Sequence, residues 1–413
     1  MSKIRILAIP PDTHGVGKFR ILSPYTYIQE NYPDDFHIDI KTDVEDKNEE
    51  FSDYDIVILH TFIHNKLSPD KNLERIKWLK EKGKIVIVDF DDYWEPDMRH
   101  PMFVQSKSSG VVKMKLDLLK AASYVTVTTS IFRDTIRKKL GLTNVYIFPN
   151  AIDENENQFK PDPLPSNKIR FGWLGGSSHM ADIELIKNGV AQTYNEYKDK
   201  VQFVLCGFDL RGTITEINKE TKEKKTRPIK PEETVWYKYE QIFTNNYSVL
   251  DKEYIDVLKM FKDVDYPVYP DSDKPYIRRW TKEISKYATN YNYFDISLAP
   301  LVPCVFNANK SQLKAIESGF HKKALIASNT DPYTIDLISM VQKGGGDYNP
   351  KGNSLLVDPM KNHKQWAQHM KRLIENPNMI EDLGNKLYET VKDKYALKKV
   401  SEDRVQFLKS IIK

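Results

Sequence analysis

The sequence contains little cysteine and no long apolar run. Only Cys206 and Cys304 occur among the 413 residues, and both lie in apolar stretches. We therefore expect no disulfide framework, and we expect the protein to reside in a reducing compartment. No apolar run reaches the ~20 residues that span a bilayer. The apolar run at the start is too short and too charged for a secretory signal and indicates a β-strand instead. These absences predict a cytoplasmic protein.

A strong charge bias is also missing. The formal net charge is +4 at pH 7, which neither indicates nor excludes a nucleic-acid or membrane partner. Hydrophobic residues make up 40% of the chain and charged residues 29%, which is the balance of a globular rather than a disordered protein. A chain of 413 residues exceeds what one hydrophobic core usually organises, so we expect two domains.

Short β-branched runs alternate with longer helical periodicities, a pattern typical of parallel α/β folds. The pattern starts again near residue 168, where a basic residue, an apolar strand and a small-residue turn follow one another as they do at the start. The polar, proline-bearing stretch 155–167 between the halves indicates a linker. Residues 400–412 are periodic enough for a terminal helix. Strands are expected at 4–9, 36–40, 56–59, 85–88, 125–128, 145–148, 168–174, 201–206, 296–299, 324–327 and 355–357.

The segment 211–280 breaks this rhythm. Residues 211–231 carry seven Lys or Arg against three Glu, and many aromatic residues follow. We expect an insertion made of a charged surface hairpin or loop, followed by helices at 235–244 and 253–261. Because charge runs usually face water, a solvated excursion explains it better than an acceptor-binding platform.

The stretch 306–319 carries the strongest chemical signal. Asn309 is a favourable N-cap and would place Lys310 and Ser311 in the first turn of a helix, with Glu317 about two turns on. A lysine at a helix start opposes the macrodipole unless an anion binds there too. A diphosphate would satisfy the free N–H groups and the ammonium, and Glu317 is placed to accept hydrogen bonds from a ribose diol. The alternative is an ordinary helix with an exposed lysine.

Two glycine-bearing loops follow predicted strands. Gly175 and Gly176 begin an N–H-rich turn at the carboxyl end of a strand, where open α/β sheets bind ligands. His179 belongs either to this loop or to the next helix. Segment 10–20 places two glycines before a helix whose N-terminus offers N–H groups to an anion. Its spacing matches neither a dinucleotide-binding motif nor a complete P-loop, so a plain strand-to-helix turn explains it equally well.

Carboxylates cluster after another predicted strand, at Asp89, Asp91 and Asp92. Such oxygens can ligate Mg²⁺ or Mn²⁺, which suggests a metal-dependent transferase or a phosphohydrolase. Recognition of acceptor hydroxyls explains them equally well, and the doubly wound pattern argues against a dedicated metal site. His60 and His64 follow the preceding strand, where they could orient sugar hydroxyls or be structural.

Taken together, these segments resemble the GT-B glycosyltransferases, particularly the retaining family-4-like group. Segments 294–301, 306–319, 324–328 and 332–333 follow that family's donor-site order, and 89–92, 125–129 and 148–153 add to the likeness. It covers nearly the whole chain, with 211–280 the least familiar portion. Its motifs are specific for fold and donor chemistry and weak for the acceptor.

The resemblance implies an α/β fold of two Rossmann-like domains with parallel sheets facing across a cleft. The N-terminal domain, 1–155, would bind the acceptor and receive the C-terminal helix, about 397–413. The domain 165–396 would bind the nucleotide sugar. The implied activity is transfer of a hexosyl or pentosyl group from a nucleotide-diphosphate sugar to an acceptor hydroxyl, with retention. Beyond that co-substrate no cofactor is implied, and no metal is expected to be required.

One departure concerns the two glutamates that many relatives carry eight positions apart. Here Asn309 occupies the earlier position, so only the Glu317 role, binding the ribose, carries over. Relatives also use an Arg/Lys pair against the diphosphate, for which Lys310 is the first choice and Arg278, Arg279 or Lys282 its partner. The implied site has catalytic residues Lys310, His60 and Asp91; donor-binding residues Gly175, Gly176, Ser177, Arg279, Lys282, Asn307, Ser311, Gln312 and Glu317; and acceptor-binding residues His14, Gly15, Gly17, Lys18, Arg20 and Asp92.

Three other functions stay open. A glycosyltransferase acting on modified bases in DNA would use the lysine-rich insertion to follow phosphates, with steep salt dependence. A catalytically inactive GT-B-like protein would bind nucleotide without transfer, and a phosphohydrolase would need metal at 89–92. The sequence leaves open the donor sugar, the nucleobase, a glycan, lipid-linked or DNA acceptor, peripheral membrane contact and the oligomeric state. It indicates no obligate protein partner.

Overall fold

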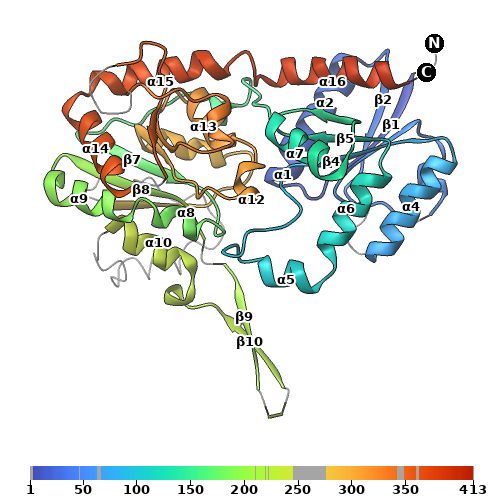
Figure 1. Ribbon diagram of the computed structural model, residues 1–413, viewed down its shortest axis with the longest axis horizontal. Helices are drawn as coiled ribbons and strands as arrows, with labels where there is room; N and C mark the ends of the chain where they lie inside the picture. The colour runs from blue at the N-terminus through green and yellow to red at the C-terminus, as the bar shows by residue number, and fades with distance from the viewer. Residues whose placement is uncertain are drawn as a thin grey trace.

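The computed structural model describes residues 3–412 except 46, 63–66, 210, 219, 222, 245–275, 342–347 and 360–361. Two α/β lobes lie side by side, each built on its own sheet (Figure 1). None of the described helices is long and apolar enough to cross a bilayer.

The N-terminal lobe contains a six-stranded sheet in the order β2-β1-β3-β4-β5-β6, with every neighbouring pair parallel. Its central strand β3 is buried along its whole length, as expected for a parallel sheet covered on both faces. The strands are β1 (Ile4–Ile9), β2 (Phe36–Ile40), β3 (Ile56–His60), β4 (Ile85–Phe90), β5 (Tyr124–Val127) and β6 (Val145–Ile147). The helical segments are α1 (Gly15–Gly17), η1 (Lys18–Leu22), α2 (Ser23–Asn31), α3 (Glu49–Ser52), α4 (Pro69–Glu81), α5 (Phe103–Ser108), α6 (Val111–Ala121) and α7 (Ser130–Leu140).

The C-terminal lobe contains a second parallel six-stranded sheet, in the order β11-β8-β7-β12-β13-β14. Its strands are β7 (Ile169–Leu174), β8 (Val201–Phe208), β11 (Tyr276–Trp280), β12 (Ile296–Ala299), β13 (Ala324–Ser328) and β14 (Leu355–Val357). Its helical segments are α8 (Met180–Glu184), α9 (Lys187–Tyr197), η3 (Pro231–Glu233), α10 (Val235–Thr244), η4 (Tyr287–Tyr293), α12 (Val305–Ala308), α13 (Leu313–Phe320), η5 (Tyr333–Ile335), α14 (Asn362–Glu375) and α15 (Asn378–Val391). The single turn η2 (Asn157–Phe159) lies between the two sheets in the chain.

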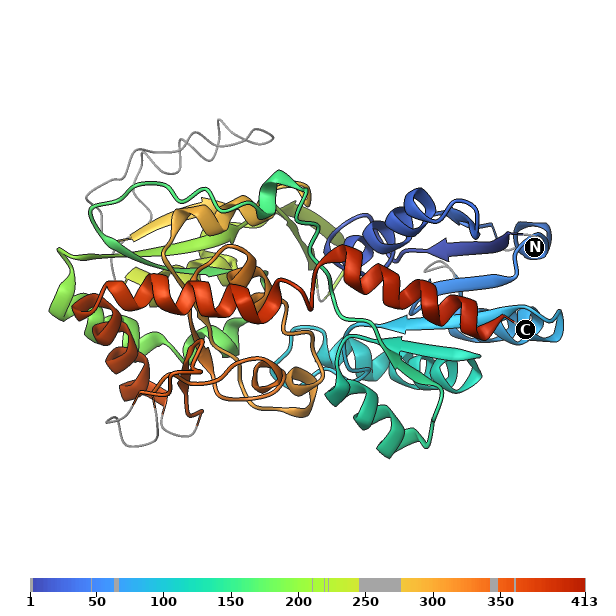
Figure 2. The same cartoon turned by 90° about the horizontal axis from the view of Figure 1, so that it is seen from above.

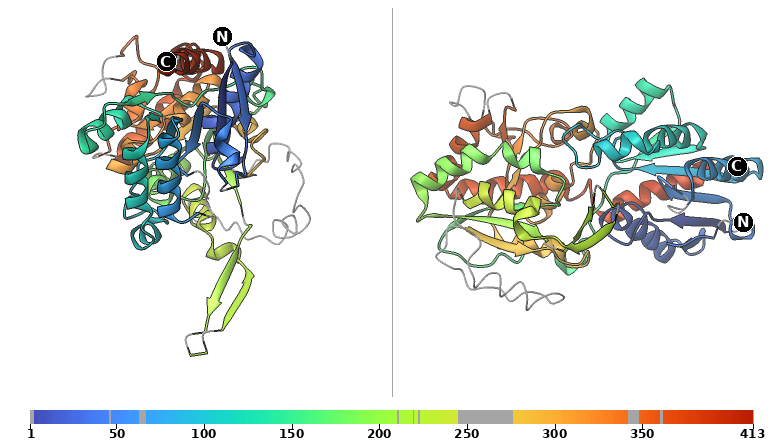
Figure 3. Two further views of the ribbon diagram at one scale, coloured as in Figure 1. Left: turned by 90° about the vertical axis from the view of Figure 1, so that its right-hand side faces the viewer. Right: turned by 90° about the horizontal axis from the view of Figure 1, so that it is seen from below.

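The expected strands all occur, with ends that differ by at most two residues. The sequence did not reveal β11, which pairs with β8 at the edge of the second sheet. Two consecutive arginines interrupt its apolar pattern, so periodicity gave no strand signal there. The expected hairpin is confirmed: β9 (Thr213–Ile217) and β10 (Lys224–Pro228) pair antiparallel and project away from both lobes (Figure 3). Of the two helices expected after it, α10 forms as expected, and 253–261 lies outside the described residues.

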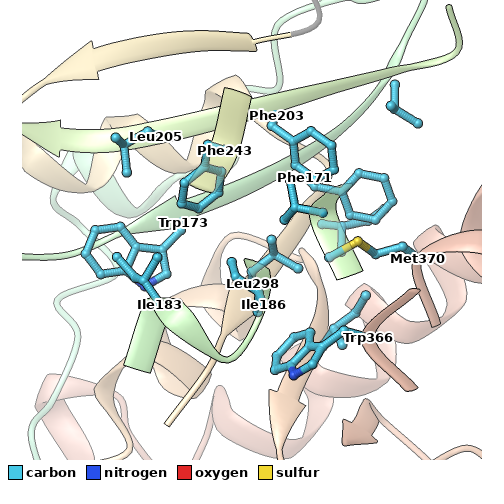
Figure 4. Packing of buried hydrophobic residues seen from close by; sticks show 14 of the residues in the cluster. Phe171, Trp173, Ile183, Ile186, Phe203, Leu205, Phe243, Leu298, Trp366 and Met370 are labelled. Carbon is cyan, nitrogen blue, oxygen red and sulfur yellow. The ribbon is translucent and has the colours of Figure 1, made fainter. Parts of the chain in front are cut away.

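An aromatic core holds the second sheet to its helices. Phe171 and Phe203 on neighbouring strands stack with ring centroids 5.7 Å apart, and Trp173 and Trp366 are fully buried in the same cluster (Figure 4). Gly172 sits in β7 because a Cβ there would lie 2.0 Å from the ring of Phe294. This packing fixes the carboxyl ends of β7 and β12, where the candidate site lies.

The C-terminal helix α16 (Leu397–Ile411) crosses back to the N-terminal lobe (Figure 2). Its side chains Val405, Phe407, Leu408 and Ile411 pack into the N-terminal core. Ile152, just before the linker, forms a parallel bridge with Ala396, just before α16. The chain therefore crosses between lobes at two adjacent points, and the expected return of the C-terminal helix is confirmed.

Replacing Phe407 with Ala should reduce stability by about 3 kcal/mol, because it removes a large buried side chain and leaves a cavity. Phe407 contacts the rings of Tyr146 and Phe148, with centroids 4.5 and 5.4 Å away. Urea unfolding at equilibrium measures the effect, with the exposed Lys398→Ala on the same helix as control. Equal stability of the two variants would contradict the docking of α16.

Candidate functional site

The candidate donor site lies at the start of α13, after strand β12. The expected helix from Asn309 is not one helix: α12 ends at Ala308, and α13 begins at Leu313 with Gln312 as its N-cap. The N-cap assignment of Asn309 was therefore wrong, because its Nδ2 donates to the Val305 carbonyl at 2.7 Å and closes α12. Among the described residues, no acceptor bonds the backbone N–H groups of residues 311–314. Three of these amides, at residues 312–314, belong to the start of α13, where a helix leaves donors unpaired, and that of Ser311 directly precedes it.

Two lysines lie beside these amides. The ammonium of Lys310 is 4.7 Å from the centre of the Phe306 ring. Lys314 donates to the carbonyl of Leu174 and lies 4.9 Å from the centre of the Trp173 ring. Burial, with a smaller contribution from the charge of Lys310, lowers the pKa of Lys314 to about 8, while Glu317 and Asp182 act in the other direction. Both positive side chains and the positive end of the helix therefore occupy one small region.

The loop after β7 faces the same region. A Cβ at Gly175 would lie 3.0 Å from the Lys314 ammonium, while Gly176 and Ser177 are exposed. The Gly176 carbonyl accepts from the Tyr239 hydroxyl at 3.3 Å. The strands β7 and β12 are adjacent and parallel at the point where the strand order reverses, which is where α/β sheets usually bind ligands.

Lys314 is the cation that sequence reasoning missed, since it reads as an ordinary lysine inside a helix. The expected partners of Lys310 lie elsewhere. Arg278 forms a buried ion pair with Glu240, which engages its guanidinium within the protein. Arg279 and Lys282 lie 4.3 and 5.1 Å from the centre of the Tyr293 ring, after or at the end of β11. They remain donor-site predictions for a different part of the same sheet edge.

Glu317 lies one turn after Lys314 on α13 and is 5% exposed. Its carboxylate accepts hydrogen bonds from the hydroxyls of Tyr287 and, at 2.9 Å, Tyr291. Burial raises the pKa of Glu317, although both hydroxyls and Lys314 oppose this. A carboxylate can accept about four hydrogen bonds, so two positions are left after the tyrosines.

Three further predicted donor residues lie just before α13: Asn307 in α12, and Ser311 and Gln312 in the turn between the two helices. Asn307 is engaged with the protein, because its Nδ2 donates to Asp182 and to the Val302 carbonyl at 3.2 and 2.9 Å. Gln312 donates to Asp336 and Tyr395 at 3.0 and 2.6 Å. The Ser311 hydroxyl and the Gln312 Oε1 are buried and have no partner among the described residues. The Asn309 Oδ1 is in the same situation, so these three atoms are the polar groups of this turn that a ligand could engage.

The opposite wall, from the N-terminal lobe, is built on a charge network at the ends of β3 and β4. Arg20 binds Asp89 through two hydrogen bonds of 2.9 and 2.8 Å. The Nε2 of His60 lies 3.0 Å from Asp91. Burial would lower the pKa of His60, but Asp91 and Asp89 outweigh it and raise the pKa. Burial would likewise raise the pKa of Asp91, but His60 and Arg20 outweigh it and lower the pKa to about 2.

Asp92 lies next to this network and faces the opposite lobe. Burial and the negative charge of Asp91 raise its pKa to about 6, while Lys310 and Lys115 act in the other direction. Phe306 of the C-terminal lobe packs in the core cluster of the N-terminal lobe, so the two lobes meet here. Nearby, the His100 ring lies 5.2 Å from the Phe306 ring. The segment just before α13 therefore contacts the N-terminal lobe.

Segment 10–20 differs most from its expected role. The Asp12 carboxylate accepts from the amides of His14 and Gly17 at 2.8 and 3.1 Å, so the protein supplies its own anion there. Gly17 is needed for packing, since a Cβ there would lie 1.8 Å from the Asp12 carbonyl oxygen. Arg20 is fully buried, and assigning it to the acceptor was wrong because its guanidinium is enclosed by protein partners.

The remaining predicted residues are placed as follows. Lys18 forms an ion pair of 2.5 Å with the linker residue Glu156. His14 is exposed and Gly15 half-buried at the start of α1, and both stay acceptor predictions. His64 lies outside the described residues. Among the described residues, no three His, Cys, Asp or Glu side chains converge as metal ligands.

Comparison with known proteins gives the fold a wider context. No family model and no curated protein matches the chain. HepE of Anabaena, solved with UDP and glucose, superposes with a TM-score of 0.60 at 10% identity, over 99% of this chain and 100% of that one. A glycosyltransferase from Rickettsia africae gives 0.58 at 13%, over 100% of both chains. A putative UDP-N-acetylglucosamine 2-epimerase from Listeria monocytogenes gives 0.51 at 8%, over 99% and 96%. With its two parallel sheets, the chain has the GT-B fold.

Replacing Asp92 with Asn tests the electrostatics of this wall through the pH dependence of stability. The pKa in the folded chain, about 6, exceeds the ordinary 3.8, so Asp92 contributes stability while protonated and loses it as pH rises through about 6. The free energy of unfolding of Asp92→Asn should exceed that of the unaltered chain by roughly 1 kcal/mol at pH 7.5, after allowance for solvent screening, and by much less near pH 4.

Urea unfolding at the two pH values measures this difference, with the exposed Asp162→Asn as control. An equal gain at both values, or a loss at pH 7.5, would contradict the placement of Asp92 beside Asp91.

Proposed function

We propose that the chain is a glycosyltransferase that transfers a sugar from a nucleotide-diphosphate donor to an acceptor hydroxyl. One observation carries the proposal: the four unpaired amides of residues 311–314 and the ammonium groups of Lys310 and Lys314 occupy one region. This concentration of positive charge suits a diphosphate. The adjacent Glu317 suits the ribose of the same ligand. UDP-glucose is the first donor to test, because the HepE structures contain UDP with glucose and UDP-glucose.

In this proposal the diphosphate is the leaving group. Its departure builds negative charge on a β-phosphate oxygen, and fixed donors aimed there stabilise the transition state more than water would. Lys310, the amides of residues 311–314 and the loop at Gly175 supply those donors. His60 and Asp91 act from the opposite lobe, where His60 is hydrogen-bonded to Asp91 and holds the carboxylate that would accept from sugar hydroxyls.

The stereochemical course is proposed from the family resemblance. Retention would follow from attack on the face that the diphosphate leaves, with the departing phosphate taking the acceptor proton. The chain needs no metal for this sequence, because Lys310 and Lys314 carry the compensating charge. A lid-like closure of the lobes about the linker and the region before α16 would exclude water from the reacting atoms.

The arginines near the hairpin β9–β10 do not support a DNA acceptor, which would therefore depend on lysines such as the exposed Lys224 and Lys225. Arg227 is paired with Glu216 and Glu233 at 2.8 and 2.7 Å, and Arg211 is paired with Asp209 at 2.9 Å. These arginines are therefore neutralised by the protein itself. A salt-dependent hold on phosphates would need positive charges that are not already paired.

Donor binding is tested directly by thermal shift with UDP, UDP-glucose and UDP-N-acetylglucosamine. A ligand at 100 times its Kd should stabilise the chain by about 2.7 kcal/mol. Sugar transfer to an acceptor panel, with release of UDP, separates a transferase from a nucleotide-binding protein. Conversion of UDP-N-acetylglucosamine to its C2 epimer without transfer, or no shift with any nucleotide sugar, would contradict the proposal.

Lys310→Ala should lower kcat by about 100-fold or more, since it removes a donor aimed at the leaving group. Its melting temperature should stay close to that of the unaltered chain, because the ammonium has no carboxylate partner in the described salt bridges. The exposed Lys187→Ala is the matched control. Unchanged kcat and kcat/KM in Lys310→Ala would remove this residue from the site.

A further inference from the structure

Glu317 is held from outside its own helix. The hydroxyls of Tyr287 and Tyr291, both on η4, donate to its two different carboxylate oxygens. Each oxygen therefore has one tyrosine donor and about one acceptor position to spare. Two spare positions on neighbouring oxygens match the spacing of two hydroxyls on adjacent ring carbons. The tyrosines thus set the direction in which Glu317 can accept from a ligand.

Of the two tyrosines, Tyr287 is the one that contacts the N-terminal lobe and the linker turn. The ring of Phe19, from the N-terminal lobe, meets it edge-on at 6.4 Å and 89°. The ring of Phe159, in the linker turn η2, meets it at 6.3 Å and 80°. Edge-to-face pairs of this kind are favourable and restrict the ring orientation. Tyr287 therefore lies where both lobes and the linker meet.

Polar contacts fix the backbone around Tyr287 in the same way. The linker residue Gln158 is buried; its Nε2 donates to the Ile284 carbonyl at 3.1 Å, and its Oε1 accepts from the Ala288 amide at 3.3 Å. Gln158 also donates to Glu156 at 2.5 Å, which pairs with Lys18 of the N-terminal lobe. Lys18 and Phe19, within the segment 10–20 that the sequence suggested for the acceptor, thus support the segment that holds Glu317.

We propose that Tyr287 is a positioning residue for the donor ribose: its hydroxyl directs Glu317 toward the ribose diol, and Phe19 of the opposite lobe fixes its ring. This inference rests on the proposed function, because it needs a ribonucleotide at the start of α13. It adds that ribose recognition by the C-terminal lobe depends on a side chain of the N-terminal lobe.

The test measures discrimination rather than affinity alone. Kd values for UDP, 2′-deoxy-UDP and 3′-deoxy-UDP are measured by calorimetry for the unaltered chain, Tyr287→Phe and Phe19→Leu. The unaltered chain should bind UDP about tenfold more tightly than either deoxy compound, since each lost hydroxyl bonded a carboxylate. Tyr287→Phe should bring both ratios to within about threefold of unity, and Phe19→Leu should reduce them partly.

Tyr276→Phe is the matched control. It removes a buried tyrosine hydroxyl that donates to another buried carboxylate, Glu240, at 2.7 Å in the same lobe. The Tyr276→Phe variant should be less stable than the unaltered chain, but it should keep both ratios of deoxy-compound Kd to UDP Kd. A merely structural Tyr287 would behave like this control, with lower stability and unchanged discrimination.

The outcomes separate the two proposals. If the unaltered chain binds neither UDP nor any nucleotide sugar, the proposed function fails and the inference with it. If the unaltered chain binds UDP and prefers the ribonucleotide, but Tyr287→Phe keeps the full preference, only the inference is overturned. Equal binding of UDP and both deoxy compounds by the unaltered chain would also overturn it.

Discussion

Uncompensated positive charge at the start of α13 is the constraint around which the candidate site is organised. The four amides of residues 311–314 have no acceptor among the described residues, and Lys310 and Lys314 add two ammonium groups. The nearest carboxylate on the same helix, Glu317, is turned toward two tyrosines. Like charges in a partly enclosed place repel each other and are costly to desolvate. A bound dianion would replace this repulsion with attraction, so the same positive charges would favour its binding.

The part of the N-terminal lobe that lies near this positive region forms a wall whose charged side chains are mostly paired with one another. Arg20 with Asp89 and His60 with Asp91 form a buried, mutually hydrogen-bonded set. Breaking such a pair leaves an uncompensated buried charge, so the wall is held in one arrangement. Asp92 lies beside it with a raised pKa and is the carboxyl that responds to Lys310. The two lobes therefore bring together one strongly positive side and one rigid polar side.

The fold could be predicted from the sequence because it depends on local patterns. Apolar β-branched runs indicated the parallel strands, and the restart of the pattern near residue 168 indicated the second sheet. The site could be predicted only in part. Lys310, Glu317 and the loop at Gly175 come together at a sheet edge, as the strand order requires. The partner of Arg20 lies 69 positions away, and nothing local marks that guanidinium as buried. Lys314 was missed because its contacts, Trp173 and Leu174, lie on strand β7, far from it in the sequence. Asn309 was assigned as an N-cap from its propensity, but its side chain bonds the Val305 carbonyl instead.

The most direct test of the account is a crystal structure of the chain with UDP bound. The account predicts β-phosphate oxygens within about 3 Å of amides in residues 311–314, with the Lys310 ammonium in contact and the ribose at Glu317. A UDP molecule bound away from the start of α13, or one whose phosphates point away from these amides while the ribose lies elsewhere, would contradict it.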